Sequence, residues 1–283
     1  MSNENLISAR QLERLLPAGR CLVVDCRFDL SHPETGLQEY LGGHIPTASH
    51  ANLDTDLAAE ITDRSGLHPL PEAAAFAGFL SRAGWDSSKL LVAYDGRTNA
   101  MAARLWWLMQ YFGQRAALLD GGLAAWTGAG LPLQQGMAAV KPSDRPTLIA
   151  QAGRVVSVTE VLDSLNGDGL TLVDARSPER YAGEIEPMDA VAGHIPGAIN
   201  RPLGLNLDER GQFKPAAILK AEINAQLNDR PPQSVVHYCG SGVTACHNQF
   251  AMQLAGLGHT RIYAGSWSEW SRDASRPVAT GRS

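Results

Sequence analysis

Short apolar runs alternate with longer stretches of helical spacing along this chain. Four runs have the length and continuous apolar character of strands that are covered on both faces. They are CLVVD at 21–25, LLVAY at 90–94, TLVDA at 171–175 and SVVHY at 234–238. Residues 71–84 and 101–113 have helical spacing and end at glycine. This alternation predicts an α/β fold, in which a parallel sheet is flanked by helices on both faces.

The chain also repeats itself. LVVDCR at 22–27 is followed by GGHIPTA at 42–48, and TLVDAR at 171–176 is followed by AGHIPGA at 192–198. Two later blocks recur in the same order, LLVAYDG as SVVHYCG and the segment ending at Trp126 as the one ending at Trp270. Four matched blocks in one order indicate a duplicated domain, and therefore two tandem copies of the same fold.

Residues 134–146 separate the last block of the first copy from the first block of the second. This stretch is polar, contains two prolines and has little periodicity, which is typical of a linker. We expect an N-terminal domain at 1–138 and a C-terminal domain at 150–283.

Composition excludes several classes of function. The 283 residues carry a net charge of -5, which argues against a nucleic-acid binder. The apolar stretches are too short to span a membrane, and the N-terminus lacks the pattern of a signal peptide, so we expect a cytoplasmic protein. The four cysteines show no metal-binding spacing. We expect neither a metal nor a cofactor.

Cys239 stands where reactive chemistry is expected in a parallel sheet, directly after a buried strand. Gly240 and Gly242 permit a tight turn with bare backbone, so that successive N–H groups converge on the sulfur. A helix is expected to begin near Val243 or Thr244, and its N-terminus adds positive potential. Both effects favour a thiolate or another anionic sulfur species.

The repeat provides an internal comparison for this loop. The first copy has Asp95 where the second has Cys239. A nucleophilic thiol is therefore present in one copy only. We expect the C-terminal domain to be catalytic and the N-terminal copy to be non-catalytic.

The paired domains, the two GHIP[TG]A segments and the CGSGVTA loop together resemble the tandem-domain rhodanese family over essentially the whole chain. Within it, the CGSGVT loop is similar to that of 3-mercaptopyruvate sulfurtransferases, whereas thiosulfate sulfurtransferases typically carry basic residues after the cysteine. The resemblance implies that Cys239 takes sulfur from mercaptopyruvate, releases pyruvate and holds the sulfur as a persulfide. The acceptor would be cyanide or a thiol, such as that of a thioredoxin-like protein.

The resemblance also implies roles for further residues. Ser241, His68 and Asp54 would form a relay that moves a proton during donor cleavage. Arg180 would bind the donor carboxylate, while the substrate also contacts the loop residues Gly240, Gly242, Val243 and Thr244. The sequence departs from the family at Met188, where mercaptopyruvate enzymes have a second arginine.

Two alternatives remain open at this stage, and a third is disfavoured. Thiosulfate could be the donor, although the neutral Gly240 and Ser241 offer this dianion no cation. The chain could instead be a non-catalytic sulfur carrier or binding module. A phosphatase of the Cys-x5-Arg type is disfavoured, because Ala245 stands at the arginine position.

Overall fold

The computed structural model describes residues 5–165, 167 and 169–282, and these form two compact units. The first unit contains Met1–Ala59, Leu70–Gln151 and Glu209–Phe213, and the second contains Glu60–Pro69, Ala152–Asp208 and Lys214–Ser283. Each unit thus consists of most of one sequence repeat and one short segment of the other. Along the chain, we keep 1–138 and 150–283 as the proposed limits of the two domains.

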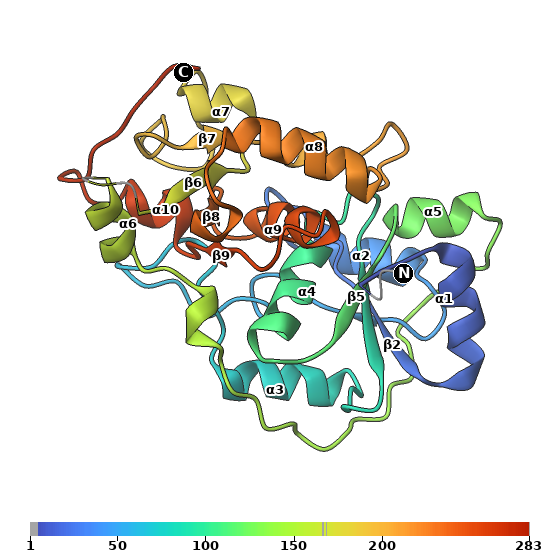
Figure 1. The fold of residues 1–283 in the computed structure, drawn as a ribbon. Helices are drawn as coiled ribbons and strands as arrows, with labels where there is room; N and C mark the ends of the chain where they lie inside the picture. The colour runs from blue at the N-terminus through green and yellow to red at the C-terminus, as the bar shows by residue number, and fades with distance from the viewer. Residues whose placement is uncertain (1–4, 166, 168, 283) are drawn as a thin grey trace. The chain divides into compact units, whose positions relative to one another are not determined.

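The first unit alternates strands and helices (Figure 1). Its elements are β1 (Leu6–Ile7), α1 (Ala9–Leu15), η1 (Leu16–Ala18), β2 (Cys21–Asp25), α2 (Thr35–Gly42), β3 (Ser49–His50), α3 (Ala73–Arg82), β4 (Leu90–Tyr94), α4 (Ala102–Tyr111), β5 (Ala116–Leu119) and α5 (Gly122–Gly128). Figure 1 shows α1 and α5 on one side of β2 and β5, and α3 and α4 on the other.

The second unit has the same alternation in a shorter form. Its elements are η2 (Ala152–Arg154), α6 (Val158–Ser164), β6 (Thr171–Asp174), α7 (Pro178–Ala182), β7 (Ile199–Asn200), η3 (Leu203–Asn206), α8 (Ala216–Leu227), η4 (Pro232–Ser234), β8 (Val235–Tyr238), α9 (Ala245–Leu254), β9 (Arg261–Ile262) and α10 (Ser266–Trp270).

Both sheets are parallel and share one strand order. Among the described residues the first sheet runs β1-β5-β4-β2-β3 and the second runs β7-β6-β8-β9, which is the same order read from the other end without the strand β1. A parallel bridge from Val155 to Ile262 stands where the first unit has β1. The predicted α/β fold with two tandem copies is therefore confirmed.

Alternate residues of the central strand β8 face different helices. Val236 and Tyr238 pack in the cluster that contains residues of α6, α7 and α10. His237 points to the opposite face, where it lines a small apolar cavity with Ile223 of α8 and Met252 of α9. This two-residue period with burial on both faces explains why the strand has no position for an exposed polar side chain.

A buried polar network closes the carboxyl end of each sheet. In the second unit, Arg176 binds Asp174 at 2.7 Å and the carbonyl oxygen of Gly193 at 2.7 Å. His194 stacks on Tyr181 with ring centroids 3.7 Å apart, and its Nδ1 contacts the Tyr181 carbonyl oxygen at 2.7 Å. The first unit has the same contacts among Asp25, Arg27, Gly43, Tyr40 and His44. The GHIP histidines are therefore structural in both copies.

Within the described part of the chain, no helix is long and apolar enough to cross a membrane.

Candidate active site

Cys239 lies in the turn that joins β8 to α9, where 2% of its surface is exposed. The backbone N–H of Cys239 is donated to Ser266 Oγ at 3.1 Å, and Trp267 donates its N–H to the Cys239 carbonyl oxygen at 3.0 Å. The start of α10 thus holds the backbone of the cysteine. The sulfur itself accepts the N–H of Gly242 at 3.1 Å. This contact places a backbone donor beside the reactive atom.

The turn requires glycine at position 242. Its φ is +79°, and a Cβ built there would lie 2.4 Å from the carbonyl oxygen of Ala264. A side chain would therefore push the loop away from β9, and the N–H that Cys239 accepts would move with it. Val243 is buried, and Thr244 occupies the N-cap position of α9.

Ser241 and His68 share a hydrogen bond of 2.6 Å between Oγ and Nδ1, and both side chains are buried. His68 comes from residues 60–69, the segment of the first repeat that belongs to the second unit. We call this segment the strap. The strap is held at two further points, where Leu67 donates its N–H to Ser268 Oγ at 3.0 Å and Arg272 donates to the Thr62 carbonyl oxygen at 2.9 Å. A serine–imidazole pair of this geometry can move a proton.

Arg180 lies over the thiol loop. A Cβ built at Gly240 would lie 3.4 Å from Nη1 of Arg180, so the guanidinium group covers the residue next to Cys239. Nε and Nη2 of Arg180 donate to the two oxygens of Glu186 at 3.3 and 2.6 Å, and Nη2 lies 3.5 Å from Oδ2 of Asp189. One edge of the guanidinium group is therefore occupied by the protein's own carboxylates.

Two further residues were singled out in the sequence, Asp54 as a member of the relay and Met188 as a departure from the family. Asp54 belongs to the first unit, where it is exposed and donates its backbone N–H to Asn52 Oδ1 at 2.8 Å. Met188 is 40% exposed on the loop after α7, and its backbone N–H is donated to Glu186. The structure thus brings Cys239, Ser241, His68 and Arg180 into one unit, and assigns Asp54 to the other.

The corresponding loop of the first unit holds a carboxyl group. Asp95 follows β4 as Cys239 follows β8, and its carboxylate accepts three backbone N–H groups. The donors are Arg97 at 3.1 Å, Asn99 at 2.8 Å and Met101 at 3.0 Å. Burial raises the pKa of Asp95, and these N–H groups act in the opposite direction. A strand–turn–helix loop of this kind converges its backbone donors on one acidic side chain.

The family model described as "Rhodanese-like domain" matches this chain twice, at residues 8–129 and 157–273. The chain belongs to the rhodanese family. Both copies of this rhodanese are covered, including the thiol loop and the Asp95 loop.

Individual relatives indicate the class of enzyme to which this rhodanese belongs. A Pseudomonas aeruginosa protein, provisionally named a 3-mercaptopyruvate sulfurtransferase, is 45% identical over 99% of this chain and 100% of its own length. A Mycobacterium tuberculosis protein, SseB, provisionally named a thiosulfate sulfurtransferase, is 37% identical over 98% of this chain and 97% of its own. The structure of 3-mercaptopyruvate sulfurtransferase from Leishmania major superposes with a TM-score of 0.86 and 29% identity, covering 98% of this chain and 77% of that one. This rhodanese is a sulfurtransferase, which takes sulfur from a small-molecule donor and passes it to an acceptor.

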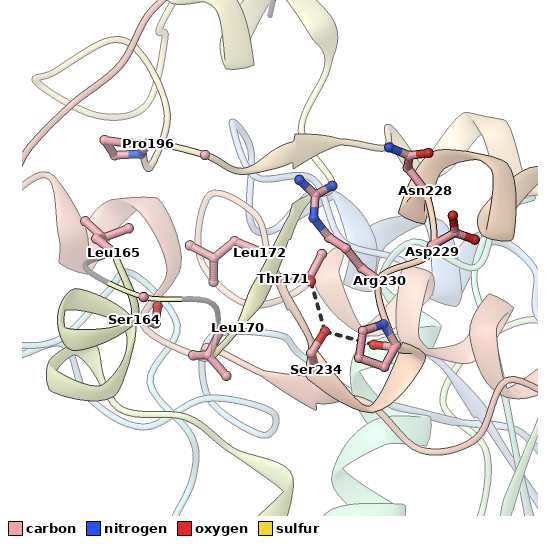
Figure 2. Close-up of a pocket in the computed structure, with 13 residues that line it drawn as sticks. Ser164, Leu165, Leu170, Thr171, Leu172, Pro196, Asn228, Asp229, Arg230 and Ser234 are labelled. Carbon is pink, nitrogen blue, oxygen red and sulfur yellow. Dashed lines mark hydrogen bonds between the residues drawn. The ribbon is translucent and has the colours of Figure 1, made fainter.

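A pocket of this rhodanese lies at the other end of the second sheet (Figure 2). It has a volume of about 620 Å³ and is lined by Thr171 at the start of β6, Ser234 just before β8, and Arg230. Cys239 follows the opposite end of β8, and does not line this pocket. The thiol loop therefore does not coincide with this pocket.

Sequence reasoning missed the acidic partners of Arg180. Glu186 and Asp189 follow it within the same loop, and Glu184 is a third acidic residue there. This density of carboxylates after a predicted donor-binding arginine was the available signal, because a partly buried arginine favours a counter-charge nearby. Ser266 and Ser268, which hold the cysteine backbone and the strap, carry no comparable signal in their spacing.

Proposed function

We propose that this protein is a 3-mercaptopyruvate sulfurtransferase that carries sulfur as a persulfide on Cys239. The observation that carries the proposal is the surroundings of the thiol. Its sulfur accepts the Gly242 N–H at 3.1 Å. The hydroxyl of Ser241, two residues after Cys239, shares a 2.6 Å hydrogen bond with His68. A nucleophile and the serine of a proton-transfer pair thus belong to one loop, and the strap supplies the imidazole.

The proposed first half-reaction begins with the Cys239 thiolate attacking the sulfur of mercaptopyruvate. The carbon–sulfur bond breaks, and its electron pair remains on the donor carbon as the enolate of pyruvate. The proton of the donor thiol passes through Ser241 and His68 to that carbon, which releases pyruvate. Cys239 keeps the sulfur as a persulfide anion, so that atoms and charge balance. We propose Asp54 as the third member of this relay.

Donor binding is proposed to depend on Arg180 and on the bare backbone of the loop. Because Nε and Nη2 of Arg180 contact Glu186, the donor carboxylate meets Nη1, which faces Gly240. We therefore expect one charge-assisted hydrogen bond from this residue and not a bidentate pair. Gly240 and Gly242 let the donor approach the backbone, and Val243 and Thr244 complete the turn.

In the proposed second half-reaction, an acceptor attacks the outer sulfur of the persulfide. The sulfur–sulfur bond breaks and its electron pair returns to Cys239 as the thiolate. Cyanide would leave as thiocyanate. A thiol, including that of a thioredoxin-like protein, would leave as a new persulfide.

The test is mass spectrometry of the intact protein after exposure to mercaptopyruvate or to thiosulfate. We expect mercaptopyruvate to add one sulfur atom to the wild-type chain and pyruvate to appear in equal amount. Cys239→Ser should lose both signals while unfolding at the same temperature, because a hydroxyl is nearly isosteric but cannot hold a persulfide. Cys246→Ser is the matched control, since this second thiol is buried within α9.

Each other outcome has a defined meaning. Loading by thiosulfate but not by mercaptopyruvate would replace the proposed donor, in line with the name of the Mycobacterium tuberculosis relative. Loading of the Cys239→Ser variant would move the nucleophile elsewhere. Loading by neither donor would favour a non-catalytic binding module.

A further inference from the structure

The guanidinium group of Arg180 belongs to a cluster in which negative charge exceeds positive charge. Glu186 contacts Arg180 at 2.6 Å and Arg176 at 3.2 Å, and Arg176 also binds Asp174 at 2.7 Å. Asp189 is the third carboxylate, 3.5 Å from Arg180. Two guanidinium groups thus face three carboxylates, and the cluster carries one net negative charge when all of them are ionised.

Asp189 is the least compensated member of this cluster. Its side chain is 7% exposed, and its Oδ2 accepts no hydrogen bond from the described residues. Its own backbone N–H is donated to Glu186 at 3.3 Å, which fixes the two carboxylates beside each other. Asp174, by contrast, accepts from the backbone and the guanidinium group of Arg176.

The charge of Asp189 changes near neutral pH. Burial and the neighbouring Glu186 raise the pKa of Asp189 to about 6, and Arg180, Arg176 and Arg272 oppose this rise. Arg272 is exposed, so solvent screens its contribution. Below this pH the protonated Asp189 leaves Arg180 to Glu186 and the donor. Above it, the ionised Asp189 competes for the same guanidinium group.

We propose that Asp189 is a specificity-determining residue that selects the charge of the sulfur donor. The negative charge of its carboxylate acts on a donor that is bound at Arg180. It repels a donor that carries two negative charges more than a donor that carries one. Mercaptopyruvate has one carboxylate and a neutral thiol, whereas thiosulfate is a dianion. The inference rests on the proposed function, because it requires a donor anion at Arg180.

The test compares Asp189→Asn with the wild-type protein, using cyanide as the acceptor for both donors. Pyruvate release reports mercaptopyruvate use, and thiocyanate formation reports thiosulfate use. The amide has the shape of the carboxyl group without its charge. We expect kcat/KM for thiosulfate to rise at least about fivefold more than kcat/KM for mercaptopyruvate, because one repulsive charge at this range acts more strongly on a dianion.

The pH profile is the second readout. In the wild-type protein, KM for mercaptopyruvate should rise as pH increases through about 6, because Asp189 becomes ionised and competes for Arg180. In Asp189→Asn this rise should be absent. A purely structural role would not move this profile. Glu184→Gln is the matched control, since Glu184 is an exposed carboxylate of the same loop that pairs with Arg282, and it should change neither readout.

The outcomes separate this inference from the proposed function. If neither donor adds sulfur to Cys239 in the wild-type protein, the proposed function itself is wrong. If loading occurs, any of three results for Asp189→Asn overturns the inference. The variant raises kcat/KM equally for both donors, raises it for neither, or retains the wild-type pH profile of KM. Asp189→Ala is measured in parallel, so that a folding defect of the asparagine variant leaves a second test of the same charge.

Discussion

Cys239 and Asp95 stand at equivalent positions of the two loops, and each side chain accepts backbone hydrogen bonds from its own turn. The carboxylate of Asp95 offers two oxygens, and three backbone N–H groups of the turn reach them. The sulfur of Cys239 accepts the N–H of Gly242. The first turn is also one residue longer, since α4 begins at Ala102 and α9 at Ala245. The carboxylate oxygens of Asp95 stand as many bonds from the backbone as the outer sulfur of a cysteine persulfide. The first copy therefore illustrates how such a turn directs backbone N–H groups to an acceptor at this distance from the backbone.

The buried side chain of His237 leads us to predict that the second unit loses stability in acid. Neither of its ring nitrogens has a hydrogen-bond partner among the described residues, and burial together with Arg201 lowers its pKa to about 3. The folded state therefore keeps His237 neutral, whereas the unfolded chain binds a proton below about 6.5. Stability should be lost as pH falls below that value, by about 2 kcal/mol at pH 5 from this residue alone.

His237→Leu should remove this component of the pH dependence, because leucine suits the apolar cavity and does not titrate. The measurement is the free energy of unfolding in urea between pH 7 and pH 5. The matched control is His32→Leu, at a histidine whose side chain is 70% exposed. An unchanged slope in the His237 variant would contradict the prediction.

At the scale of elements, the sequence was informative wherever a strand is buried on both faces. The runs at 21–25 and 90–94 became β2 and β4 at the predicted residues, because a short apolar run of this length suits the interior of a parallel sheet. The helix expected near Val243 or Thr244 begins at Ala245. The position of the thiol loop followed from the same pattern.

The rest of the candidate site could not be read from local pattern. The strap is held by tertiary hydrogen bonds such as Leu67 to Ser268, which join residues far apart in sequence. No periodicity in residues 60–69 indicates that this segment belongs to the second unit. The pairing of Arg180 with Glu186 likewise depends on how the loop after α7 folds back. His68 and Arg180 were predicted through family resemblance, and their contacts came only from the structure.

The turn before α9 yields a prediction about its glycine. Gly242→Ala combines a φ of +79° with a Cβ 2.4 Å from the Ala264 carbonyl oxygen, so we expect it to destabilise the protein by about 2–5 kcal/mol. Gly258→Ala has a similar φ of +86° but open space around the new Cβ, so it should cost about 1–2 kcal/mol. Urea midpoints of the two variants measure the difference. Equal losses would show that the close contact with Ala264 is relieved without cost.

At the scale of the whole molecule, each compact unit includes a segment of the other repeat. The strap brings His68 to Ser241 in the second unit. Residues 209–213 belong to the first unit, where Arg97 donates to the carbonyl oxygens of Glu209 at 2.6 Å and Arg210 at 3.1 Å. Neither repeat therefore contains a whole unit.

This exchange predicts the behaviour of a chain that is cut in the linker. A protease site introduced after the exposed Met137 would separate the two repeats covalently. We expect the fragments to co-elute in size-exclusion chromatography and to retain sulfur transfer, because each still completes the other's unit. The uncut insertion variant is the control. Fragments that elute separately without denaturant would show that the exchanged segments do not hold the units together.

The strap also bears on the inheritance of the gene. After a duplication, a copy without a nucleophile can ordinarily be discarded by deletion. Here a deletion of the copy with Asp95 would also remove residues 60–69, and with them the imidazole that contacts Ser241. We therefore expect selection for the proposed thiol chemistry of one half to preserve the other half as well, so that the two halves are inherited together.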